Sequence, residues 1–83
     1  MNNENNNLDA HIEAILFVKG EPMPVSGLVK ILNAPEKAIE EALVLLSEKL
    51  SERGIRLVRK DKSVMLASSP ESSEFARLLL EDE

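Results

Sequence analysis

The most constraining feature of this sequence is a long amphipathic segment in its middle, residues 35–54. Its apolar side chains recur at steps of three and four, which places them on one face of an α-helix: Ile39, Ala42, Leu43, Leu46 and Leu50. Pro35 suits the first turn of such a helix, and Gly54 suits the left-handed position after its end. At 1.5 Å per residue the helix would span roughly 28 Å, about the diameter of a small domain. The shorter flanking segments must therefore cover its apolar face.

Composition bounds what such a chain can be. The 83 residues, 43% of them hydrophobic, allow one domain with a small core. The sequence has no cysteine, which excludes disulfides and thiolate chemistry. No apolar run approaches the ~20 residues of a membrane span, and the Asn-rich N-terminus is unlike a signal peptide, so we expect a soluble cytoplasmic protein. The net charge of −5 argues against DNA binding driven by overall charge.

Two shorter helices are predicted before the central one. The first covers Leu8–Lys19 and ends at Gly20; the second covers Val25–Leu32 and ends at Asn33, which tolerates a left-handed conformation. Leu28, Ile31 and Leu32 are the expected inward positions of the second helix. The first helix is apolar on all sides over residues 14–18, so we expect it to be buried on more than one side.

A β-hairpin and a last helix are predicted after the central one. Apolar and charged residues alternate in Ile55–Lys60, and Val64–Ser68 is the returning strand across the turn Asp61–Ser63. Ser69 and Pro70 are typical of a helix start, and the helix that follows has an apolar face formed by Phe75, Leu78 and Leu79.

The predicted order is helix, helix, helix, hairpin, helix. This mainly α arrangement with a small β-hairpin is a winged helix-turn-helix. We place the winged-helix domain at residues 8–80, preceded by a disordered polar tail (residues 1–7) and followed by an acidic tail (residues 81–83).

No constellation of residues indicates catalysis. His11 is the only histidine, and no second ligand or nucleophile stands near it in the sequence. Glu36, Glu40 and Glu41 alternate with Lys37, which is typical of a salt-bridged helix surface. We therefore expect a protein that is not an enzyme and has no catalytic, cofactor-binding or metal site.

DNA binding is the alternative function, because many helix-turn-helix domains read DNA with the second helix of the pair. Here that helix is the central one, whose outward side is mainly glutamate and would be repelled by phosphates. Under this alternative, a basic wing would contact the DNA backbone through Arg56, Arg59, Lys60 and Lys62. A hairpin edge protected by charged side chains explains the same residues more simply.

Protein–protein contact is favoured by apolar residues that fall outside the helical stripes. Val44 and Leu45 lie off the stripe of the central helix, and Phe17 lies off that of the first helix. Either the hairpin and the last helix cover these three side chains, or they form a partner surface. We predict that they belong to a protein interface.

Several short stretches resemble the N-terminal winged helix of the bacterial segregation and condensation protein B (ScpB) family. These are Glu13–Val18, Gly20-Glu21-Pro22, Leu28 with Ile31-Leu32, and Glu40–Leu43. The resemblance covers residues 8–79. It implies a non-enzymatic subunit of the SMC–kleisin complex, which condenses and partitions chromosomes in the cytoplasm at the nucleoid. It also implies a homodimer that binds the kleisin subunit ScpA and, through it, SMC. Direct contact with nucleic acid is not expected, because the outward side of the central helix is acidic.

The sequence departs from the family pattern in three places. Pro24 and Pro35 stand where a capping serine is frequent, and Lys62-Ser63-Val64 replaces a Gly-Gly-aromatic hairpin turn. Family members also have a second winged helix, so we expect this chain to be a fragment or a truncated member. Self-association is therefore the more direct expectation, ahead of kleisin binding.

Overall fold

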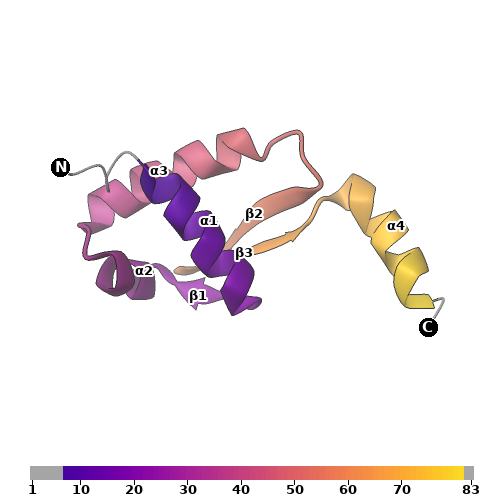
Figure 1. The fold of residues 1–83 in the computed structure, drawn as a ribbon, viewed down its shortest axis with the longest axis horizontal. Coiled ribbons are helices and arrows are strands. Elements are labelled where there is room, and N and C mark those ends of the chain that lie inside the picture. Colours follow the sequence, from indigo (N-terminus) through magenta and orange to yellow (C-terminus); the bar gives the residue numbers. More distant parts are fainter. Residues whose placement is uncertain (1–6, 82–83) are drawn as a thin grey trace.

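The computed structural model describes residues 7–81. The predicted polar tail, apart from Asn7, and the last two residues of the predicted acidic tail lie outside this range. The elements follow the predicted winged-helix order (Figure 1): α1 (Leu8–Lys19), β1 (Met23–Pro24), α2 (Val25–Leu32), α3 (Glu36–Lys49), β2 (Ile55–Lys60), β3 (Ser63–Ser68) and α4 (Pro70–Glu81).

The core lies between the three N-terminal helices and the inner face of the sheet. α1 packs on both α3 and β3, and α2 packs on α3. Large side chains from all of these elements are almost fully enclosed: Ile12, Leu16, Leu28, Ile39, Leu46 and Val64. The predicted apolar stripe of the central helix is thus buried, which confirms that the rest of the domain packs around it.

Two helix ends follow the predicted backbone chemistry. Gly20 ends α1 with a φ of 70°, and Asn33 ends α2 with a φ of 52°. The predicted end of the central helix was wrong, because α3 stops at Lys49 and Gly54 does not take a positive φ. Leu50 leaves the helical geometry while remaining buried, and the chain then makes tight turns into β2, with Arg53 N–H bonding to the Leu50 carbonyl at 3.0 Å.

The sheet has three antiparallel strands in the order β1-β3-β2, where the sequence predicted a two-stranded hairpin. The additional strand is only two residues long, and Met23 pairs with Val64 while Pro24 pairs with Ser63. Pro24 has no N–H to donate, which suits this edge position. The hairpin turn is also tighter than predicted, since Ser63 belongs to β3 and Asp61 takes the left-handed φ of 57°.

α4 projects from the body of the domain at the end of β3 (Figure 1). It makes few contacts, mainly with β3, and none of its residues is buried. The alternative in which the hairpin and this helix cover Phe17, Val44 and Leu45 is therefore wrong: these side chains are 77%, 60% and 41% exposed. The expected burial of α1 on several sides is wrong within one chain for the same reason.

Candidate protein interaction surfaces

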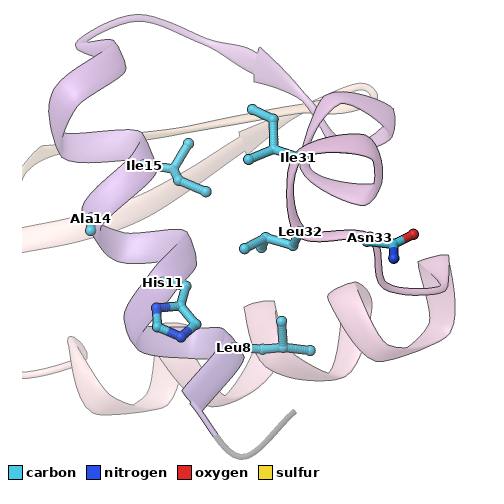
Figure 2. Close-up of a pocket in the computed structure, with 7 residues that line it drawn as sticks. All are labelled: Leu8, His11, Ala14, Ile15, Ile31, Leu32 and Asn33. Atoms are coloured by element: carbon cyan, nitrogen blue, oxygen red, sulfur yellow. The ribbon is translucent and has the colours of Figure 1, made fainter. Parts of the chain in front are cut away.

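A shallow groove runs between α1 and α2. It consists of two adjoining cavities of about 520 and 460 Å³, which share Ala14, Ile15 and Ile31. Figure 2 shows Ile15 on α1 facing Ile31 on α2, with Leu32 between the helices. We call this continuous surface the α1–α2 groove.

The groove has an apolar centre and polar ends. His11 and Asn33 line one end, and Lys19 lines the other, beside Val18 and Met23. Ile31 is 60% exposed, so its prediction as an inward residue was wrong. Sequence periodicity could not reveal the groove, because it depends on how far apart α1 and α2 lie. Apolar side chains open to solvent between two helices suit the apolar face of another peptide.

A second apolar surface lies on the other side of α1. A cavity of about 290 Å³ is lined there by Ala10, Glu13, Ala14, Phe17, Ile55 and Leu66. Phe17 is the largest of these side chains and is 77% exposed. We call this surface the Phe17 face. It joins the outer side of α1 to the end of the sheet from which α4 departs, since Ile55 pairs with Ser68.

The structure does not bring all three predicted interface residues together. Phe17 lies on the Phe17 face, whereas Val44 and Leu45 lie on the outward side of α3. Helical spacing places Val44 one turn after Glu40, which contacts β2, and Leu45 one turn before Lys49, which contacts α1. The interface role of the three residues therefore stays a prediction. It would involve two separate surfaces, the Phe17 face and the outward side of α3.

The basic residues of the predicted wing are partly neutralised. Arg59 donates two hydrogen bonds of 2.7 Å to the carboxylate of Glu40 on α3, in the paired geometry that matches guanidinium to carboxylate. The pair lowers the pKa of Glu40 and raises that of Arg59. Arg56 lies 3.5 Å from Glu71 of α4. Lys60 ends β2 and Lys62 lies in the hairpin turn.

The central helix presents an acidic surface where a DNA-reading helix would present a basic one. α3 contains four glutamates against two lysines, and Lys49 is engaged by Asp9 at 2.7 Å. That hydrogen bond from Lys49 lowers the pKa of Asp9, which is only 6% exposed in the first turn of α1. This link between α1 and α3 was not predicted, because 40 residues separate its partners.

The described residues show neither a metal site nor a membrane segment. Within residues 7–81, no group of three or more potential ligands is placed to hold a metal ion. No helix in that range is long and apolar enough to cross a bilayer.

Comparison with known proteins identifies the family of this chain. The family model of the segregation and condensation complex subunit ScpB matches residues 10–83. The chain belongs to the ScpB family. It is 29% identical over 79 residues to segregation and condensation protein B of Clostridium botulinum, and 34% identical over 71 residues to that of Clostridium acetobutylicum. These alignments cover 93% and 83% of this chain but only 41% and 35% of the relatives, so the chain spans about two-fifths of the length of ScpB proteins like these.

Solved structures of ScpB proteins have the same fold. A dimer of an ScpB N-terminal domain complexed with an ScpA peptide aligns with a TM-score of 0.79 at 27% identity, covering 86% of this chain and 91% of that one. ScpB from Mycobacterium tuberculosis aligns with a TM-score of 0.84 at 22% identity, covering 94% of this chain and 50% of that one. The winged helix inferred from the order of elements is thereby confirmed.

Proposed function

We propose that this domain works as the protein-binding winged helix of an ScpB subunit. It associates with a second copy of itself and with the kleisin ScpA, and through ScpA it joins the SMC complex that condenses and partitions chromosomes. In this role it is a non-enzymatic subunit, acting in the cytoplasm at the nucleoid without contacting DNA directly.

The observation that carries the proposal is the apolar α1–α2 groove in a member of this family. The related N-terminal domain is a dimer complexed with an ScpA peptide, so this fold is suited to both kinds of partner. Exposed isoleucine and valine side chains are unfavourably hydrated, and the free energy falls when a partner buries them. The acidic α3 supports the same conclusion, because it disfavours the approach of phosphates.

We assign the ScpA segment to the α1–α2 groove. A groove between two helices binds an amphipathic segment through apolar anchors spaced along one face. Ile15 and Ile31 supply the apolar floor, and Lys19 offers a cation to an acidic flank of the peptide. The cavity of the Phe17 face is smaller, at about 290 Å³, and a cavity of about 580 Å³ between α2 and β2 is lined by four charged side chains, so the groove suits an apolar segment better than either.

Fluorescence anisotropy with the labelled ScpA peptide of the related complex tests this function. Wild-type protein is expected to bind it, and Ile31→Glu is expected to weaken binding at least tenfold, about the effect of losing one buried side chain. Val44→Glu is the matched control, because Val44 and Ile31 are equally exposed at 60% but lie on different helices. Absence of binding by the wild type contradicts the function. Equal loss in both variants contradicts the groove assignment.

A further inference from the structure

α4 has an apolar face that nothing in the described chain covers. Phe75, Leu78 and Leu79 are spaced three and four residues apart, so they share one side of the helix, and they are 71%, 52% and 66% exposed. A helix of only 12 residues is marginal in water unless its apolar face packs against something. The apolar face of α4 therefore needs a cover that residues 7–81 do not supply.

The root of α4 is held firmly, although the rest of the helix makes few contacts. Only Ser69 stands between β3 and α4, and its backbone N–H bonds to the Gly54 carbonyl at 2.7 Å. The Ser69 hydroxyl accepts a hydrogen bond from the Ser72 N–H at 3.1 Å, which caps the helix. Because the junction is short and buried, it sets the direction in which α4 leaves the body (Figure 1). The fold of a single copy thus fixes the direction of α4, and we call α4 the arm.

The Phe17 face lies at the same end of the sheet as this root. Ile55, which lines that face, pairs with Ser68, the last residue before the junction. The α1–α2 groove is lined instead by Met23, which pairs with Val64 near the opposite end of β3. In a dimer with two-fold symmetry, an α4 helix that contacts the Phe17 face of the other copy would form this contact twice at once.

The exposed apolar area is in the range that a specific dimer interface buries. Each copy contributes two exposed phenylalanines and three exposed aliphatic side chains: Phe17, Phe75, Ile55, Leu78 and Leu79. At their observed exposures these ten side chains bring roughly 900 Å² of apolar surface to the dimer. Since about 57% of an interface is apolar, this corresponds to a total of about 1,600 Å², the standard size of a specific interface.

We propose that α4 is an exchanged arm, whose apolar side packs on the Phe17 face of a second copy of this chain. This inference rests on the proposed self-association and specifies the surface that carries it. Phe75 is the anchor of the arm, and Phe17 with Ile55 forms its receptor. Under this proposal, Phe17 is the one of the three predicted interface residues that serves self-association, and Val44 and Leu45 on the outward side of α3 do not.

Sedimentation equilibrium of single variants tests the exchange. Phe75→Glu and Phe17→Glu are each expected to weaken dimerisation by about 100-fold, because each charge enters the interface twice. Val44→Glu is expected to dimerise like the wild type. All three side chains are mostly exposed, and circular dichroism verifies that each variant is folded.

Mixing the two disruptive variants gives a readout specific to an exchanged arm. A heterodimer of Phe17→Glu with Phe75→Glu keeps one intact arm-to-face contact, whereas each homodimer keeps none. The equimolar mixture is therefore expected to dimerise at least tenfold more tightly than either variant alone. If the wild type dimerises and both variants leave the dimer intact, or only Val44→Glu disrupts it, the exchange of α4 is wrong but self-association is not. A wild type that stays monomeric at about 1 mM overturns both.

Discussion

Replacing Lys49 with methionine tests the link between α1 and α3. The Lys49 ammonium lies 2.7 Å from the Asp9 carboxylate, which is only 6% exposed. Methionine keeps most of the side-chain bulk but leaves that carboxylate without its cation. A buried acceptor left unsatisfied costs about 1–3 kcal/mol. We expect about 1–2 kcal/mol, since the Lys49 side chain is 59% exposed and water screens the pair.

The assay is thermal unfolding followed by circular dichroism at equal protein concentrations, because association raises the melting temperature. For a domain of this size, 1 kcal/mol corresponds to a Tm change of about 4–8 °C, so a loss of about 1–2 kcal/mol should make Lys49→Met melt roughly 4–16 °C lower at pH 7. Lys37→Met is the matched control, since Lys37 is exposed on the same helix. Its Tm should change by less than about 2 °C.

The pH dependence of this loss follows from the pKa of Asp9. Lys49 holds that pKa below its ordinary 3.8, so the pair stabilises the fold fully above that value and loses its effect as the pH falls through the lowered pKa. The Tm difference between wild type and Lys49→Met should therefore shrink when the pH falls from 7 to about 2.5. A difference that is absent at pH 7, or equally large at both pH values, refutes the reasoning.

Two further substitutions test the packing of α2 and the end of α1, which together position the α1–α2 groove. Leu28→Ala removes a fully buried side chain of α2 and should cost 2–5 kcal/mol in denaturant unfolding; a cost below about 1 kcal/mol would mean that α2 is loosely packed. Gly20→Ala should cost about 1 kcal/mol although nothing lies within 4 Å of the added methyl, because the φ of 70° strains an alanine backbone. An unchanged stability of Gly20→Ala would show that α1 ends differently.

The limits of α1 and α2 could be predicted because they depend on local chemistry. Gly20 and Asn33 take left-handed conformations that few other residues tolerate, and the signal lies in the residues themselves. The end of α3 could not be predicted in this way. Gly54 is as suitable a terminator as Gly20, but the buried position of Leu50 and the turn into β2 decide where the helix stops.

Features that depend on contacts between distant residues could not be predicted from the sequence. β1 exists because β3 lies beside it, and a two-residue strand containing Pro24 has no pattern of its own. The pairs Asp9–Lys49 and Glu40–Arg59 join positions 40 and 19 residues apart. The apolar face of α4 was correctly predicted from its periodicity. Periodicity indicates that such a face packs against another surface, but it does not identify that surface.

The central claim is that this winged helix binds polypeptides and not DNA. The most direct measurement is anisotropy of a labelled duplex titrated with the domain at low and at moderate salt. We expect weak binding at low salt that disappears at about 150 mM, because α3 is acidic and Arg59 is held by Glu40. Tight binding with a steep salt dependence, abolished by replacing Arg56, Arg59 and Lys60 with alanine, would contradict it.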